Sequence, residues 1–174
     1  MSAKIFIDGD AGTTGLGIHA RLKMYPGIEL LSLPAKQRKD PGAKKALMER
    51  ADIVVLCLPD HAARESVAIA LTMGKKSPRI LDASTAHRVA KGWTYGFPEL
   101  VPGQADAIAH AKLVANPGCY ATGAIALLRP LIDKGLLPAD LPISIHAVSG
   151  YSGGGKMMIA DYERGAAPAF EAYA

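Results

Sequence analysis

Short apolar runs that alternate with helical segments constrain the fold of this chain more than any other feature. Runs typical of strands cover residues 4–8, 28–33, 53–58, 79–83 and 113–115. Helical periodicity lies between them, most clearly over residues 43–50 and 62–73. The run 53–58 is apolar at every position, as expected of a strand that is covered on both faces. This alternation predicts an α/β fold with a doubly wound parallel sheet, whose ligands bind at the carboxyl ends of the strands.

The first predicted strand leads directly into a glycine-rich loop and then into a helix. In such a strand–loop–helix context, glycines let the backbone approach a pyrophosphate, and the helix N-terminus attracts its charge. The glycines are spaced G-x-x-G-x-x-G, which differs from the standard G-x-G-x-x-G, and glycines also serve plain tight turns. The flanking elements nevertheless favour a dinucleotide site formed by Gly9, Gly12, Thr13, Thr14 and Gly15.

The end of the second predicted strand indicates which dinucleotide binds. NAD-binding proteins place an acidic residue there for the ribose 2′-hydroxyl, and this chain has none. It offers Ser32 and then Lys36, Arg38 and Lys39, which could hold a 2′-phosphate. We therefore favour NADP over NAD, with Ser32 and Arg38 as binding residues; a solvated basic loop is the alternative for the two lysines. Further cofactor contacts are expected where the third and fourth strands end, at Pro59 and Ser84.

Cys119 follows the breaker Pro117-Gly118 and precedes a predicted helix over residues 120–132. Unpaired N–H groups at a helix N-terminus carry partial positive charge, which stabilises a thiolate over a thiol. The same N–H groups could hold the oxyanion that forms when the sulfur attacks a carbonyl. A buried structural cysteine is the alternative, and Cys57, within the third apolar run, is expected to be one. Because Cys119 has no such packing context, we predict that it is a nucleophile.

The pattern changes after this cysteine. Residues 143–148 alternate apolar and polar side chains, which predicts a half-buried strand of a different sheet. We place a domain boundary near Gly118, with an NADP-binding domain over residues 1–118 and the beginning of an α+β substrate domain over residues 119–174.

A second glycine-rich segment, from Gly150 to Lys156, matches most of a P-loop. Met157 occupies the position of the hydroxyl that would coordinate magnesium, which argues against an ATPase. A turn that presents Lys156 to an anionic substrate is the favoured interpretation.

Composition excludes several other classes of protein. Lys and Arg number 20 against 16 Asp and Glu, and aromatics make up only 6%, which suits anionic small molecules better than nucleic acid. No window approaches the roughly 20 apolar residues of a membrane span, and no signal peptide precedes the first strand, so we expect a cytoplasmic protein. No histidine has metal-ligand spacing with a cysteine, so no metal is predicted.

Several motifs together resemble the N-acetyl-gamma-glutamyl-phosphate reductases of the shorter-chain type. They are the Gly9 loop, Asp82-Ala83-Ser84-Thr85 with Arg88, Gly96-Phe97-Pro98-Glu99-Leu100, Asn116-Pro117-Gly118-Cys119-Tyr120, and Ser149-Gly150-x-Ser152-Gly153-x-Gly155-Lys156. The resemblance extends from the first strand to about Arg164. It implies NADPH-dependent reduction of an acyl phosphate to a semialdehyde in arginine biosynthesis, through a thioester on Cys119, by a homo-oligomer.

The resemblance also implies roles for individual residues. Arg88 and Lys156 would bind the phosphate or the substrate carboxylates, and Ser149, Gly150 and Asn116 would line the pocket. Members of the family carry a general acid/base histidine beyond the second glycine-rich segment and extend well past the length of this chain, so we expect an incomplete C-terminal part. Two alternatives stay open. One is aspartate-semialdehyde dehydrogenase or the carrier-linked reductase of lysine biosynthesis, and the other is a non-catalytic NADP-binding module.

Overall fold

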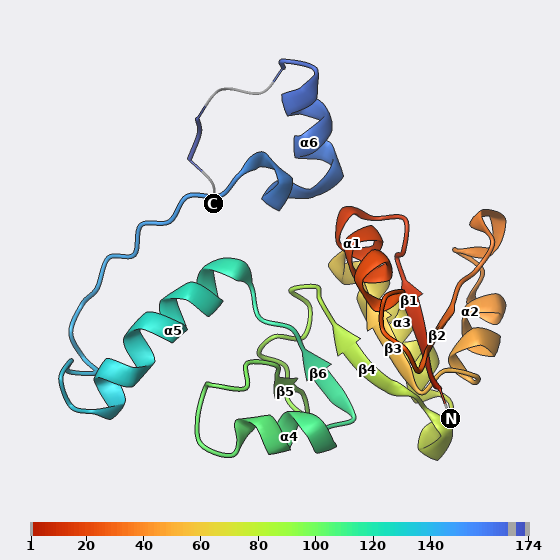
Figure 1. The fold of residues 1–174 in the computed structure, drawn as a ribbon, viewed down its shortest axis with the longest axis horizontal. Helices are drawn as coiled ribbons and strands as arrows, with labels where there is room; N and C mark the ends of the chain where they lie inside the picture. Colours follow the sequence, from red (N-terminus) through yellow and green to blue (C-terminus); the bar gives the residue numbers. More distant parts are fainter. Residues whose placement is uncertain (1, 167–169, 173–174) are drawn as a thin grey trace.

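A six-stranded parallel sheet forms the centre of the protein, in the order β2-β1-β3-β4-β6-β5 (Figure 1). The computed structural model describes residues 2–166 and 170–172. The strands are β1 (Ala3–Asp8), β2 (Ile28–Leu31), β3 (Ile53–Leu56), β4 (Arg79–Asp82), β5 (Thr94–Tyr95) and β6 (Leu113–Ala115), and every neighbouring pair is parallel. The predicted α/β fold with a doubly wound parallel sheet is confirmed.

Helices lie between most of these strands and after the last of them. The α-helices are α1 (Thr13–Leu22), α2 (Pro41–Met48), α3 (Asp60–Leu71), α4 (Gln104–His110), α5 (Cys119–Asp133) and α6 (Gly155–Glu163). Short 3₁₀ turns are η1 (Ala35–Gln37), η2 (Gly74–Lys76) and η3 (Tyr151–Gly154). No helix in the described part of the chain is both long enough and apolar enough to cross a membrane.

Alternate residues of the strands separate into two cores, one on each face of the sheet. Phe6, Val54 and Leu56 join the larger core with residues of α2 and α3. Ile5 and Val55 point the other way and pack with residues of α1. Side chains of successive residues in a strand leave opposite faces, so a run that is apolar throughout fits a sheet with helices on both sides.

The sheet has a topological switch point between β1 and β3. From β1 the chain crosses to β2 on one side, whereas β3 and β4 continue on the other side. In open parallel sheets a crevice forms at such a point, outside the carboxyl ends of the strands. The glycine-rich loop after β1 and the start of α3 after β3 both lie at this edge.

The segment between β4 and β6 contains elements without a clear sequence signal. β5 is only two residues long, and Thr94 and Tyr95 pair with Val114 and Ala115 of β6. Such a short strand shows no periodicity, and its pairing depends on a partner that lies further along the chain.

The prediction of a strand over residues 143–148 is wrong. The structure has no strand there, and every residue of this segment is exposed. Backbone groups of a strand need a neighbouring strand as a partner, and none in the described part of the chain pairs with this segment. Instead the chain extends from the far end of α5 back to α6, which contacts α1 (Figure 1).

Candidate active site

The glycine-rich loop packs directly against the end of β3. Gly9 has a φ of +94°, and a Cβ atom there would lie 2.2 Å from the carbonyl oxygen of Cys57. A Cβ atom on Gly15 would lie 2.2 Å from the carbonyl oxygen of Gly9. Glycine is therefore required at both positions, and the backbone of the loop is left open for a ligand to approach closely.

The helix N-terminus behind this loop has free donors. Gly12 precedes the first turn of α1 in an extended conformation, and among the described residues no side chain caps the helix and no acidic residue lies in its first turn. The first amides of an α-helix have no partner within the helix, so those of Thr13, Thr14 and Gly15 are available to a bound anion. An uncapped helix N-terminus of this kind attracts anions, a pyrophosphate among them.

A cavity of about 470 Å³ opens beside the loop. It lies between the loop, the segment after β2 and the start of α3, and its lining includes Arg38, Lys39, Lys44, Pro59 and His61. The predicted cofactor residues Arg38 and Pro59 therefore come together with the glycine-rich loop. Ser32 is exposed and is not part of this lining.

Carboxylates balance two of the cations in this cavity. Arg38 Nε lies 3.2 Å from Asp10 Oδ1. Lys44 Nζ lies 2.8 Å from Asp8 Oδ2, and the buried Ser66 hydroxyl donates to the same oxygen at 2.6 Å. No local sequence signal marks Asp8, Asp10 or Lys44 as part of this site, because their partners are distant in the chain. In the sequence, Lys44 is one of several scattered basic residues and nothing distinguishes it from the others.

A buried polar network lies where β4 ends. The carboxylate of Asp82 is fully buried; it accepts from the backbone N–H of Ser84 at 2.9 Å and from its hydroxyl at 2.7 Å. His87 Nδ1 lies 2.6 Å from Asp82 Oδ2, and the His87 ring stacks on Trp93 with centroids 4.2 Å apart. The Ser84 hydroxyl is thus engaged within the protein, and its contact with a cofactor stays a prediction. The network holds the turn that leads to Arg88.

Asp60 ties the same turn to α3. Its two carboxylate oxygens accept from the backbone N–H of Thr85 at 3.0 Å and from the Thr85 hydroxyl at 2.6 Å. The hydroxyl hydrogen bond is the main cause that lowers the pKa of Asp60. Together with the Asp82 network, these bonds fix the backbone of residues 84–88.

Arg88 rests against the backbone that leads into α5. Its Nε donates to the carbonyl oxygen of Asn116 at 3.2 Å. A Cβ atom on Gly118 would lie 2.8 Å from Arg88 Nη1, so the guanidinium lies close to the residue that precedes Cys119. The structure therefore brings Arg88, Asn116 and Cys119 together at the carboxyl ends of β4 and β6.

Cys119 is exposed and occupies the first position of α5, behind an extended Gly118. No side-chain cap competes for the first amides of α5 among the described residues, and in the same part of the chain no hydrogen bond joins the thiol to an ionisable group. Cys57 differs in its environment. It lies just after β3, partly buried against the core, and burial, followed by the charges of Asp8 and Asp82, raises its pKa to about 11.

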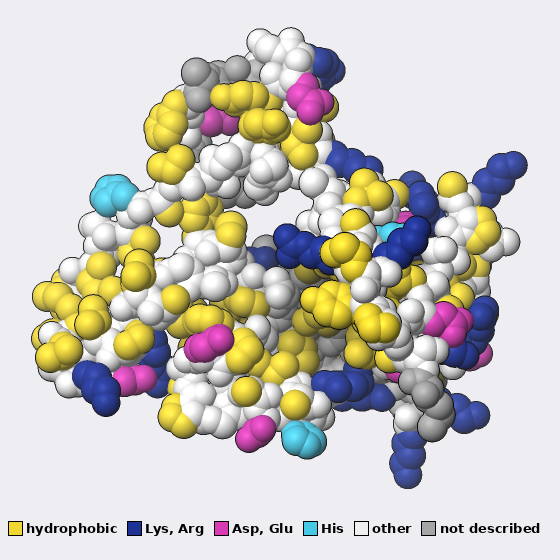
Figure 2. All heavy atoms as spheres, in the orientation of Figure 1, with side chains coloured by type: hydrophobic (Ala, Val, Ile, Leu, Met, Phe, Trp, Pro, Cys, Tyr) yellow, Lys and Arg dark blue, Asp and Glu magenta, His cyan; other side chains and the backbone are white. Residues whose placement is uncertain are grey.

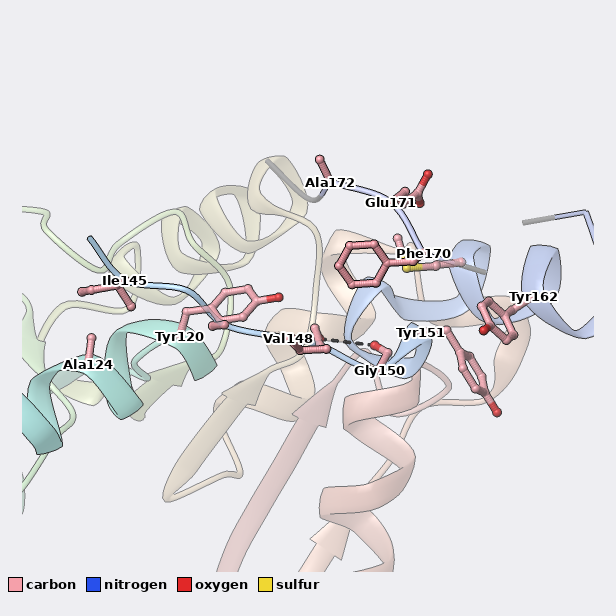
Figure 3. Close-up of a pocket in the computed structure, with 14 residues that line it drawn as sticks. Tyr120, Ala124, Ile145, Val148, Gly150, Tyr151, Tyr162, Phe170, Glu171 and Ala172 are labelled. Carbon is pink, nitrogen blue, oxygen red and sulfur yellow. Dashed lines mark hydrogen bonds between the residues drawn. The ribbon is translucent and has the colours of Figure 1, made fainter. Parts of the chain in front are cut away.

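A second cavity, of about 660 Å³, lies between α5, the segment before η3, and α6 (Figure 3). Tyr120, the neighbour of Cys119, points into it, and Ser149 and Gly150 are part of its lining. Tyr151 and Tyr162 stack at its other end, with ring centroids 4.6 Å apart. Lys156 is exposed on α6 and is not part of the lining, so its predicted role has no geometric support here.

Two family models match the chain. The model described as "Semialdehyde dehydrogenase, NAD binding domain" matches residues 21–109. The model described as "Semialdehyde dehydrogenase, dimerisation domain" matches residues 119–174. The chain belongs to the semialdehyde dehydrogenase family.

Curated relatives within this family carry the name expected from the motifs. N-acetyl-gamma-glutamyl-phosphate reductase of Chelativorans sp. (strain BNC1) is 59% identical over 163 residues, which are 94% of this chain and 52% of the relative. The protein of the same name from Burkholderia cenocepacia (strain J2315) is 57% identical over 91% of this chain and 50% of its own length. The resemblance is thus confirmed, and the chain spans about half the length of the curated relatives it matches.

Solved structures of semialdehyde dehydrogenases share the fold. Aspartate semialdehyde dehydrogenase from Francisella tularensis has a TM-score of 0.64 at 19% sequence identity. The matched region is 91% of this chain and 48% of that protein. The Candida albicans enzyme, solved with NADP, has a TM-score of 0.57 at 16% identity, covering 77% of this chain and 48% of that protein. At these identities the likeness concerns the fold alone.

Proposed function

We propose that the protein containing this chain reduces N-acetyl-gamma-glutamyl phosphate to N-acetylglutamate semialdehyde and inorganic phosphate with NADPH, in arginine biosynthesis. The observation that carries the proposal is the exposed Cys119 at the start of α5, in a chain 59% identical over 163 residues to a reductase of that name. The proposed boundary near Gly118 separates the cofactor-binding part from the substrate part.

Residues of the cofactor cavity suit NADPH. The uncapped amides of Thr13, Thr14 and Gly15 would bind the pyrophosphate. Arg38 and Lys39, which line the cavity beyond the loop, would bind the 2′-phosphate. When bound, NADPH supplies the hydride that reduces the acyl group held on the cysteine.

Cys119 would be the nucleophile that forms a covalent intermediate with the substrate. Its sulfur anion attacks the carbonyl carbon of the acyl phosphate, the bond from that carbon to the phosphate oxygen breaks, and inorganic phosphate leaves with the electron pair. The product is a thioester on Cys119. When the semialdehyde is released, the carbon–sulfur bond breaks and the sulfur regains its electron pair. The first amides of α5, which no side chain caps among the described residues, would hold the carbonyl oxygen while it carries negative charge.

Arg88 is suited to hold the substrate beside this sulfur. Its guanidinium lies next to Gly118, anchored through Nε to the backbone. A guanidinium binds phosphate or carboxylate through two parallel hydrogen bonds, which a lysine cannot reproduce. We therefore expect Arg88→Lys to raise KM for the acyl phosphate although the charge is kept. The resemblance to the family implies a histidine as the general acid/base beside Cys119, and no histidine of this chain is assigned that role.

The reverse reaction tests the proposal. The protein that contains this chain should reduce NADP⁺ with N-acetylglutamate semialdehyde only when inorganic phosphate is present, and Cys119→Ala should abolish the reaction. In the forward direction without NADPH, N-acetyl-gamma-glutamyl phosphate should release one equivalent of phosphate per active site in a burst. Turnover that does not need phosphate, or a higher kcat/KM with aspartate semialdehyde, would contradict the proposed substrate.

We further propose a homo-oligomer built through the substrate domain, in the cytoplasm. The match of residues 119–174 to a dimerisation domain supports this assembly. Apolar side chains gather over α5 and the residues after it (Figure 2), where Leu127 and Leu136 are 74% and 73% exposed. Large exposed apolar patches are typical of protein interfaces.

A further inference from the structure

A carboxylate lies inside the loop that is proposed to receive the pyrophosphate. Asp10 follows Gly9, and its side chain is only 16% exposed. A bound phosphate next to an unpaired carboxylate would be repelled, because like charges oppose each other strongly where water is partly excluded. Arg38, which also lines the cavity, neutralises this carboxylate, with its Nε 3.2 Å from Asp10 Oδ1.

The ion pair connects two separate loops at the carboxyl edge of the sheet. Asp10 belongs to the loop after β1, and Arg38 follows η1 in the segment after β2, the neighbouring strand. The ion pair joins Asp10 Oδ1 to Nε of the guanidinium at 3.2 Å. In the described part of the chain, Asp10 is the one residue that forms an ion pair with Arg38. The Arg38 side chain is 42% exposed, so a ligand can reach its guanidinium.

The other cations of the cavity are less suited to this role. Lys44 is held by Asp8 and Ser66, its side chain is only 12% exposed, and separating it from a buried carboxylate would leave an uncompensated charge. Lys39 has no carboxylate partner among residues 2–166 and 170–172, and nothing there orders its flexible stem. Of these three cations, Arg38 combines exposure to a ligand with a carboxylate partner that orders its side chain.

We propose that Asp10 is a positioning residue that holds the guanidinium of Arg38 toward the 2′-phosphate and thereby sets a preference for NADPH over NADH. The inference rests on the proposed function, because it assumes that the cavity binds the dinucleotide. Asp10 orders a long side chain before the ligand arrives, so less conformational entropy is lost on binding. NADH has a hydroxyl in place of the 2′-phosphate and gains little from this arrangement.

Fluorescence titration of NADPH and NADH with the chain tests the role of Asp10. Asp10→Ala should weaken NADPH binding about threefold to tenfold, the effect expected when one long side chain is no longer ordered in advance. NADH binding should change less than about twofold, because the lost contact concerns the 2′-phosphate alone. Asp10→Glu keeps the negative charge that pairs with Arg38 Nε and should restore most of the NADPH affinity.

A double-mutant cycle separates positioning from other effects. In an Arg38→Ala background, Asp10→Ala should no longer weaken NADPH binding, because the residue through which it acts is absent. Tighter or unchanged NADPH binding by Asp10→Ala, or equal weakening of both dinucleotides, would overturn the inference and leave the proposed function intact. Absence of NADPH binding by the unmodified chain would overturn the cofactor assignment as well.

Discussion

Alkylation at neutral pH should separate the two cysteines of this chain. Burial is the main cause that raises the pKa of the Cys57 thiol from 9.0 to about 11. Only the thiolate reacts, so at pH 7.4 this shift alone lowers the reactive fraction of Cys57 roughly 100-fold relative to an unshifted thiol. Partial burial slows access further. Cys119 is exposed at the start of α5. We expect it to take nearly all of the label from iodoacetamide.

Peptide mass spectrometry over a time course measures both rates in one experiment. The Cys57 rate should rise about tenfold for each pH unit until pH approaches its pKa, because the thiolate fraction does. Cys119→Ala should remove the fast phase, and Cys57→Ala should leave it unchanged. In 8 M urea the two rates should converge, since the burial of Cys57 is lost. Folded-state rates within about tenfold of each other would refute the reasoning. Equal slow rates would favour a non-catalytic NADP-binding module.

Three further substitutions, one of them with a matched control, test the glycine-rich loop and the networks around it. Gly15→Ala should abolish NADPH binding and destabilise the fold by about 1–3 kcal/mol in urea unfolding, because its Cβ would lie 2.2 Å from a carbonyl oxygen. Gly17→Ala is the matched control: it lies in open space on the same helix and should stabilise the fold by about 0.5–1 kcal/mol. Ser66→Ala removes a buried hydrogen bond to the carboxylate that ends β1 and should cost about 1–3 kcal/mol in urea unfolding at pH 7; no loss would show that this bond contributes nothing. The lowered pKa of Asp60 means that its contribution to stability is fully present above about pH 4 and is lost as pH falls through the folded-state value. Asp60→Asn should therefore reduce the loss of stability between pH 5 and pH 2, and an unchanged acid dependence would argue against the Thr85 hydrogen bonds.

Local signals predicted the core of the fold well. The run that became β3 is apolar throughout because helices cover both faces of the sheet, and this pattern is visible without a structure. The alternating pattern over residues 143–148 was misleading, since alternation predicts a strand only where a partner strand exists. β5 could not be predicted, because its two residues are too few to show a pattern. It is a strand only because β6 pairs with it.

The sequence by itself determined the parts of the site that depend on neighbouring residues. Gly9 and Gly15 let the loop pack closely against β3 and its own backbone, and the break at Pro117-Gly118 places Cys119 at a helix start, because turn and helix preferences act within a few residues. Only the tertiary structure decided which charged groups meet. Asp8 and Ser66 are 58 positions apart, and Arg88 reaches the backbone of a residue 28 positions away. Such contacts depend on which strands lie side by side in the sheet, and this spatial order is set by the packing of the whole sheet.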